Sequence, residues 1–237
     1  MNTGRFISIL EEIAPPELAE EFDEGRIGLI VEGREDIESV ACSLDATGYS
    51  VSQAVACGAD ALVVHHPPIW DPLTRVSGKD AFILRKALSS GLNIYAMHTN
   101  FDHAEGGIND ALAEILGLSG IAKMPLGLVG DCSLTPSEIS AILGGGLRLY
   151  NCPEKIGRIA VVGGNGFDPE LIDCACELGA DAFLSAELKH SVMRNSPPEP
   201  GLMESTHYAL ESPGMRRLAE RMGWTYIADE PELSVIP

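Results

Sequence analysis

The 237-residue chain lacks any long apolar run: no stretch approaches the roughly 18 continuous apolar residues of a membrane-spanning helix. Residues 1–12 hold too short an apolar region for a secretory signal peptide. Positive charge is also scarce, because 16 Lys and Arg stand against 35 Asp and Glu, and the formal net charge is −19. This balance argues against a broad basic surface for nucleic acid or anionic membrane. We therefore expect a cytoplasmic protein with no nucleic-acid partner and no membrane partner.

The six cysteines lack the spacing of a metal site, and Cys174 and Cys176 are too close together for a CxxC motif. Reduced, mostly buried thiols are the expectation. The glycine-rich run 163–166 lacks the full GxGxxG pattern and the lysine of a phosphate-binding P-loop. This run is therefore predicted to be a tight turn, with a phosphate cradle as the alternative.

Apolar runs alternate with helical patterns along the chain, which is typical of βαβ units in an α/β protein with mainly parallel sheets. A boundary between two parts of the chain is predicted near residues 123–127. Because proline disfavours helical geometry in the residue before it, residues 207–211 are predicted to form a separate turn, and the last helix to start at Pro213. The expected strands cover 27–31, 40–45, 61–66, 92–98, 159–162, 181–187, 202–206 and 224–228. The other expected helices cover 5–13, 50–57, 79–90, 108–116 and 136–143, with one more beginning at Asp168 and Pro169.

Two adjacent histidines, His65 and His66, end an apolar strand, and Pro67 and Pro68 follow at once. Open α/β sheets bind ligands beyond the carboxyl ends of their strands, so both imidazoles are expected at the functional edge. Neighbouring residues of a regular strand point to opposite faces, and the bend imposed by the prolines allows both rings to converge. The pair is predicted to bind a metal ion, whereas a lone histidine at this position would be structural.

Further histidines and carboxylates follow other expected strands: Asp45, then His98 with Asp102, then His207 with Glu211. Nitrogen and carboxylate ligands together favour zinc, iron, manganese, cobalt or nickel over calcium. Alternatives are a surface ion pair for His207 and Glu211, and an Asp102 cap for the turn at Gly106.

The roles of Asp45, Glu187 and His190 stay open among metal ligands, partners that orient histidines, and proton-transfer groups. His103 is ambiguous and is compatible with a solvent-exposed position.

The motifs at residues 43–47, 58–67, 95–102 and 207–211 together resemble the Nif-three-like family, represented by the bacterial YbgI proteins and often labelled "GTP cyclohydrolase I type two". The resemblance covers nearly the whole chain. Residues 185–190 are similar to the family's Thr-Gly-Glu-Ile-x-His segment but differ at its first two positions, and Thr206 replaces the usual glycine before His207.

This resemblance implies two facing α/β lobes with mainly parallel sheets and a metal site in the cleft between them. The first lobe would contain residues 1–122 and 205–237, and the second would contain residues 123–204. The resemblance also implies two divalent transition metal ions per chain, with His98 close by, and a homo-oligomer: a toroidal hexamer built as a trimer of dimers. The implied ligands are His65, His66, Asp102, His207 and Glu211.

The function expected from these residues is a metal-dependent hydrolase that uses metal-activated water. The family label implies a GTP cyclohydrolase-like reaction, and a nucleotide-like or phosphorylated small-molecule substrate is the broader expectation. Glu187, His190 and His98 are candidate catalytic groups for proton transfer. The alternative is a non-enzymatic metal carrier, an insertase or a regulatory adaptor, which would use the same ligands.

Overall fold

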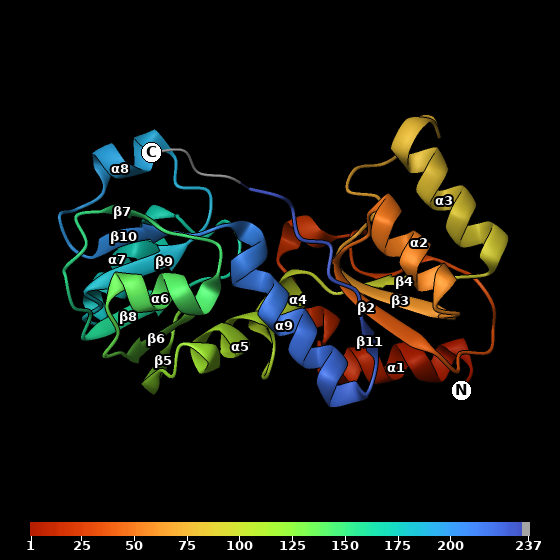
Figure 1. Ribbon diagram of the computed structural model, residues 1–237, viewed down its shortest axis with the longest axis horizontal. Coiled ribbons are helices and arrows are strands. Elements are labelled where there is room, and N and C mark those ends of the chain that lie inside the picture. Colours follow the sequence, from red (N-terminus) through yellow and green to blue (C-terminus); the bar gives the residue numbers. More distant parts are fainter. Residues whose placement is uncertain (234–237) are drawn as a thin grey trace. The chain divides into compact units, whose positions relative to one another are not determined.

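The computed structural model describes residues 1–233 and contains two compact units, each built around its own sheet (Figure 1). Unit 1 comprises Met1–Glu105 and the chain from Met215 onward, and unit 2 comprises Gly106–Gly214. The predicted α/β class is confirmed. These boundaries differ from those expected near residues 122 and 205. Leu112 and Leu210, which were expected in the first lobe, both lie in the hydrophobic core of unit 2.

Unit 1 has a five-stranded sheet in the order β1-β4-β3-β2-β11. Strands β2, β3, β4 and β11 run parallel, and β1 is antiparallel to β4. The strands are β1 (Gly28–Val31), β2 (Val40–Asp45), β3 (Ala61–His66), β4 (Asn93–Ala96) and β11 (Thr225–Tyr226). The helices are α1 (Thr3–Ile13), α2 (Gly48–Ala56), α3 (Gly78–Ser90), α4 (Thr99–His103) and the end of α9 (His207–Met222), with short 3₁₀ turns η1 (Pro16–Leu18) and η2 (Glu21–Asp23).

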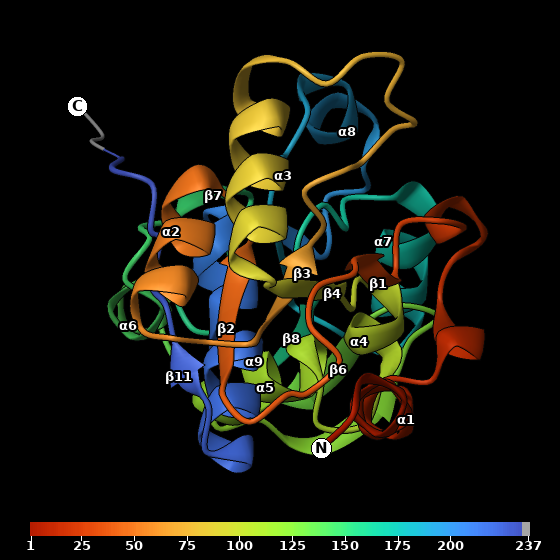
Figure 2. The same ribbon diagram turned by 90° about the vertical axis from the view of Figure 1, so that its right-hand side faces the viewer.

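Helices cover both faces of the unit 1 sheet. Leu62 and Val64 of β3 pack in one hydrophobic core with residues of α2 and α3, and these two helices lie side by side in both views (Figures 1 and 2). Tyr95 of β4 meets Phe6 of α1 edge to face, with ring centroids 6.3 Å apart. Because successive strand residues alternate between faces, Tyr95 and its neighbour Ile94 in the α2–α3 core mark opposite sides of the sheet. Helices α2 and α3 therefore cover one face of this sheet, and α1 packs against the other.

Unit 2 has a six-stranded mixed sheet in the order β5-β6-β8-β9-β10-β7, in which the neighbouring pairs β8–β9 and β9–β10 are parallel and the other neighbouring pairs are antiparallel. The sheets are thus mainly parallel in unit 1 but mixed in unit 2. The strands are β5 (Ser119–Lys123), β6 (Leu128–Asp131), β7 (Arg148–Tyr150), β8 (Arg158–Val161), β9 (Ala182–Ser185) and β10 (Gly201–Glu204). The helices are α5 (Ile108–Ile115), α6 (Pro136–Leu143), α7 (Pro169–Glu177), α8 (His190–Asn195) and the beginning of α9.

Helix α9 continues through Pro213, so the prediction of a separate turn over residues 207–211 is wrong. An interior proline removes one backbone hydrogen bond and costs about 3 kcal/mol or more. On either side of it, Leu210 and Met215 are completely buried, and this packing offsets the local cost. His207 and Glu211 consequently stand one turn apart on a regular helix. Among the described residues, no helix is long and apolar enough to span a bilayer.

Candidate metal centre

Three histidine rings of unit 1 lie together where β3 and β4 end. The ring centroids of His65 and His66 are 4.8 Å apart, and those of His98 lie 4.9 Å from His65 and 5.5 Å from His66. One ring nitrogen from each histidine lies within 4.8 Å of the other two. Strand alternation alone would send His65 and His66 to opposite faces, yet both rings point into the same cluster. The fold of unit 1 therefore brings three imidazole rings together.

Each of these three rings has a hydrogen-bond acceptor at Nδ1. The acceptors are the Met97 carbonyl oxygen for His65, the Asp45 carboxylate for His66 and the Asp23 carboxylate for His98, at 2.8, 2.8 and 2.9 Å. A carbonyl oxygen can only accept, so Nδ1 of His65 is the donor of this hydrogen bond. Carboxylates favour the same tautomer in the other two rings. This backing by carbonyl or carboxylate is typical of histidines that bind metal through Nε2.

Asp23 lies directly beside this cluster, and no sequence pattern predicted it. The residue lies on η2, is completely buried, and accepts hydrogen bonds from His98 and from the backbone N–H and hydroxyl of Thr99. Burial alone raises the pKa of Asp23, but the hydrogen bonds from His98 and Thr99 outweigh it and hold the pKa below its ordinary value. Asp23 is therefore a buried carboxylate anion behind His98. The contact between Asp23 and His98 joins residues 75 positions apart in the chain, and this contact alone reveals the role of Asp23.

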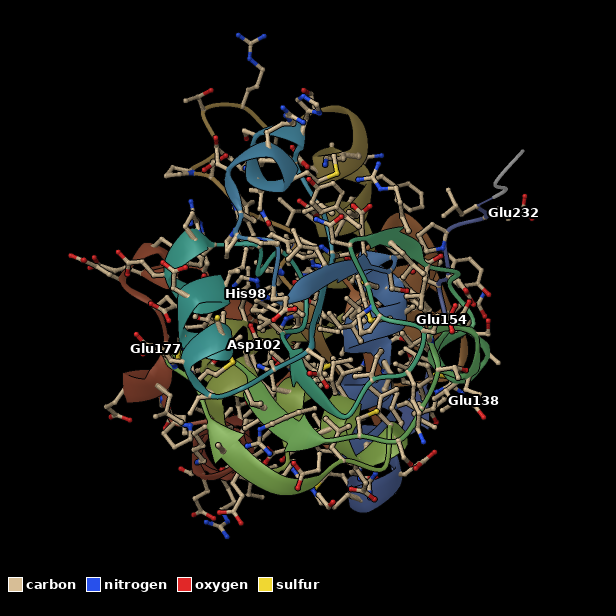
Figure 3. The ribbon with its side chains drawn as sticks, turned by 90° about the vertical axis from the view of Figure 1, so that its left-hand side faces the viewer. His98, Asp102, Glu138, Glu154, Glu177 and Glu232 are labelled. Carbon is tan, nitrogen blue, oxygen red and sulfur yellow. The ribbon has the colours of Figure 1, made fainter. Side chains whose placement is uncertain are left out.

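Asp102 of α4 lies one helical turn after His98, and Figure 3 labels both side chains, together with four glutamates. Asp102 is 8% exposed, and its Oδ1 is 3.5 Å from Nε2 of His65. Two donors on one transition metal ion lie about 3–3.5 Å apart, so this spacing suits a shared ion. The alternative role for Asp102, a cap for the turn at Gly106, is filled by Asp110, which accepts the hydrogen bond from the Gly106 N–H.

In unit 2, the ligand candidates His207 and Glu211 stand one turn apart at the start of α9. Nε2 of His207 is 3.1 Å from Oε2 of Glu211, and Glu211 is 2% exposed. Nδ1 of His207 lies 2.7 Å from the carboxylate of Glu187. Glu187 has a φ of 64°, a left-handed conformation that is uncommon for a residue other than glycine and is often found at functional sites. Among the roles left open by the sequence, this contact is of the kind expected of a partner that orients a histidine.

The two remaining histidines lie outside these clusters. Nε2 of His103 is hydrogen-bonded to Glu20 at 2.9 Å on the surface of unit 1. His190 is the exposed first residue of α8, and within residues 1–233 its side chain has no hydrogen bond. The pattern of Nδ1 contacts thus separates His65, His66, His98 and His207 from His103 and His190.

The glycine-rich run after β8 is a tight turn that packs against the ligand atoms of unit 2. Gly164 has a φ of +66°, and a Cβ atom added to it would lie 2.3 Å from Oε1 of Glu211 and 3.2 Å from Nε2 of His207. The N–H of the preceding Gly163 is held by the side chain of Asn109 at 2.8 Å. This hydrogen bond holds the turn in place. Because Gly164 has no side chain, it leaves room for the side chains of Glu211 and His207.

Replacing Gly164 with alanine should lower the affinity of the protein for divalent transition metal by roughly 10- to 100-fold, because the new methyl group displaces Glu211 and His207 from their positions. Isothermal titration with Co²⁺ measures this loss. The matched control is Gly179→Ala, which places alanine at a φ of +77° with only Arg158 Cδ at 4.0 Å. Equal losses of affinity in the two variants would mean that backbone strain, and not displacement of the ligands, is the cause.

The comparisons with known proteins agree with the resemblance drawn from the motifs. Residues 1–236 match the family described as Duf34/NIF3 (NGG1p interacting factor 3). A protein of Clostridium perfringens named "GTP cyclohydrolase 1 type 2 homolog" is 31% identical over 245 residues, which cover 94% of this chain and 91% of that protein. A protein of the same name from Escherichia coli K12 is 32% identical over 210 residues, covering 81% and 82%.

Solved structures show the same fold. The protein ybgI, titled as of unknown function, has a TM-score of 0.85 and 26% identity, covering 98% of this chain and 99% of that one. Reduced HcgD from Methanocaldococcus jannaschii has a TM-score of 0.80 and 26% identity, covering 95% and 96%.

Proposed function

Because the chain belongs to the Duf34/NIF3 family, we propose that it is a dinuclear metal-binding protein that acts as a metal-dependent hydrolase. Relatives that carry the name of a GTP cyclohydrolase homolog support this reaction class. The proposed ligands are His65, His66, Asp102, His207 and Glu211. The proposed substrate is GTP or another nucleotide-like or phosphorylated small molecule.

The observation that carries the proposal is the anchoring of the imidazoles. Three histidines of unit 1 and His207 of unit 2 each have Nδ1 against a carbonyl or carboxylate oxygen. This arrangement presents Nε2 as the coordinating atom and fixes the plane of each ring before an ion arrives. Nitrogen and carboxylate donors of this kind suit zinc, iron, manganese, cobalt or nickel, so the residues present fit a pair of divalent transition metal ions.

Divalent ions at this centre would supply the Lewis acidity that makes water a nucleophile near neutral pH. The chain itself provides the buried carboxylates of Asp102 and Glu211, which offset the cationic charge where water is scarce. Glu187 is better placed for proton transfer than His190, because its carboxylate is 53% exposed and is hydrogen-bonded to His207. In this position it can pass a proton between the His207 side of the site and solvent.

The test combines metal content with turnover. Protein purified without oxygen should contain about two equivalents of transition metal per chain and should hydrolyse GTP or a member of a panel of phosphorylated small molecules. Glu211→Ala should lower the metal content and reduce turnover at least about 100-fold. The matched control is Glu177→Ala, which removes an exposed glutamate at the end of α7. A protein that holds both ions, hydrolyses nothing in the panel and passes its metal rapidly to a competing chelator would instead be a metal carrier.

A further inference from the structure

We propose that Phe22 and Trp70 form a stacking platform for the purine base of a nucleotide substrate. The inference rests on the proposed hydrolase function and deepens it, because it names the part of the substrate that unit 1 recognises and the residues that contact it. It concerns neither the number of metal ions nor their ligands.

Two large aromatic side chains of unit 1 are exposed beside the same imidazole. Phe22 is 56% exposed and Trp70 is 41% exposed. Their ring centroids lie 6.2 and 5.0 Å from that of His98, with interplanar angles of 70° and 89°. Phe22 belongs to the turn η2, whereas Trp70 lies in the loop between β3 and α3. A single exposed apolar side chain is ordinary on a protein surface, so the meeting of two aromatic rings at one candidate catalytic group is the feature that needs an explanation.

Arg26 connects the two aromatic residues. Its guanidinium stacks on the Trp70 ring, with 4.7 Å between Cζ and the ring centroid. The same group donates hydrogen bonds to the carbonyl oxygens of Trp70 and Phe22, and it is paired with Asp71 at 3.3 Å. One arginine therefore fixes the backbone of both segments and supports the indole ring from one side.

The backbone around Phe22 is also held at both of its neighbours. The buried carboxylate of Asp23 accepts hydrogen bonds from His98 and from the N–H of Thr99. On the other side, the N–H of Glu20 donates to the hydroxyl of Thr99 at 2.8 Å. The exposed ring of Phe22 is thus carried by an anchored turn. Anchoring a contact residue before its ligand arrives lowers the conformational cost of binding.

A planar heteroaromatic group is the ligand that suits exposed rings of this kind. Base stacking on aromatic side chains requires only an accessible ring face, which a purine offers and a base-free phosphorylated compound does not. The contact with His98 favours the substrate of the proposed centre, because a nucleotide whose reacting group lies at the imidazole cluster has both rings beside it. The formal net charge of −19 works against a nucleotide held through its phosphates alone, so contacts with the base have to contribute affinity.

The test measures nucleotide binding to the full, metal-loaded chain. The probes are GTP and inorganic tripolyphosphate, which has no base. In isothermal titration, the parent should bind GTP at least about 10-fold more tightly than tripolyphosphate. Phe22→Ala and Trp70→Leu should each weaken GTP binding about 5- to 150-fold and leave tripolyphosphate binding unchanged, because each removes a stacking surface for the base. Where GTP is turned over, these variants should raise KM by the same factor and keep kcat within about threefold of the parent.

Trp70 supplies a direct optical readout. The chain contains two tryptophans, Trp70 and Trp224, so Trp224→Phe leaves Trp70 as the single one. GTP should quench the fluorescence of this protein in a saturable way, and adding Phe22→Ala should shift the midpoint to higher GTP concentration. Tripolyphosphate should leave the fluorescence unchanged. A Trp70 ring that only packs against its neighbours would give no response to GTP.

Two controls separate stacking from folding. Phe82→Ala removes another exposed phenylalanine of unit 1, located on α3 and 51% exposed, and should leave GTP affinity unchanged. Trp70→Phe keeps an aromatic face at position 70 and should retain most of the affinity that Trp70→Leu loses.

Several results would overturn the inference. A parent that bound no GTP, or that bound GTP and tripolyphosphate equally, would exclude recognition of the base. If Phe22→Ala and Trp70→Leu bound GTP as the parent does but changed the oligomeric state in sedimentation, the rings would form an interface between copies of the chain. Turnover of phosphorylated compounds by the parent in any of these cases would leave the proposed hydrolase intact. Conversely, GTP binding that depends on both rings without any turnover would support the platform and contradict the hydrolase.

Discussion

Replacing His65 with alanine should remove nearly all turnover, with kcat/KM falling at least about 1,000-fold, and should empty the metal centre. His65 is completely buried, and its Nδ1 is fixed by the Met97 carbonyl at 2.8 Å, so no other side chain can take its place without rebuilding the end of β3. The lost hydrogen bond leaves that buried carbonyl unsatisfied and costs about 1–3 kcal/mol of folding free energy. Metal analysis, turnover and thermal unfolding measured on the same preparation separate the two effects.

The matched control is His103→Ala in the same unit. Within residues 1–233 the His103 side chain is hydrogen-bonded to Glu20 and lies outside the imidazole cluster, so metal content and turnover should stay at the level of the parent. A His65→Ala protein that keeps two ions and full turnover would contradict the assignment of His65 as a ligand. A variant that is inactive but retains both ions would place His65 in substrate contact instead.

The strand ends of unit 1 could be predicted from the sequence because the signals there are local. The apolar run before His65 and His66 and the prolines after it determine where β3 ends, and the parallel arrangement brings the end of β4 beside it. The same reasoning could not reach Asp23, since its contact with His98 joins segments 75 positions apart. It also left the role of Glu187 open, because a left-handed residue in a loop has no distinctive sequence pattern.

Unit 2 was harder to predict for two physical reasons. Strand β5 is mostly exposed and contains Gly120, so it lacks the apolar run that marks a buried strand, and the β5–β6 hairpin was missed. In α9, the rule that proline disfavours helix before it was outweighed by the burial of Leu210 and Met215. Pairing with β6 in the first case, and side-chain packing in the second, decided the structure against the local preference.

The second large effect concerns stability: Phe6→Ala should lower the free energy of unfolding by about 3–5 kcal/mol. Phe6 is 1% exposed and joins α1 to the sheet of unit 1 through Tyr95, with Trp224 also 6.3 Å away. Losses of this size are a large fraction of the roughly 5–15 kcal/mol that stabilises a typical domain. Urea unfolding followed by far-ultraviolet circular dichroism measures the change, with chelator present because an ion bound only to the folded state adds stability.

The control for Phe6→Ala is Phe82→Ala on α3, where the ring is 51% exposed and the loss should stay below about 1 kcal/mol. Tyr95 lies on β4, which leads directly into Met97 and His98, so loosening α1 should also disturb the imidazole cluster. Added Co²⁺ should therefore raise the unfolding midpoint of Phe6→Ala by less than it raises that of the parent. An equal rise in both proteins would mean that α1 supports the fold of unit 1 without shaping its metal site.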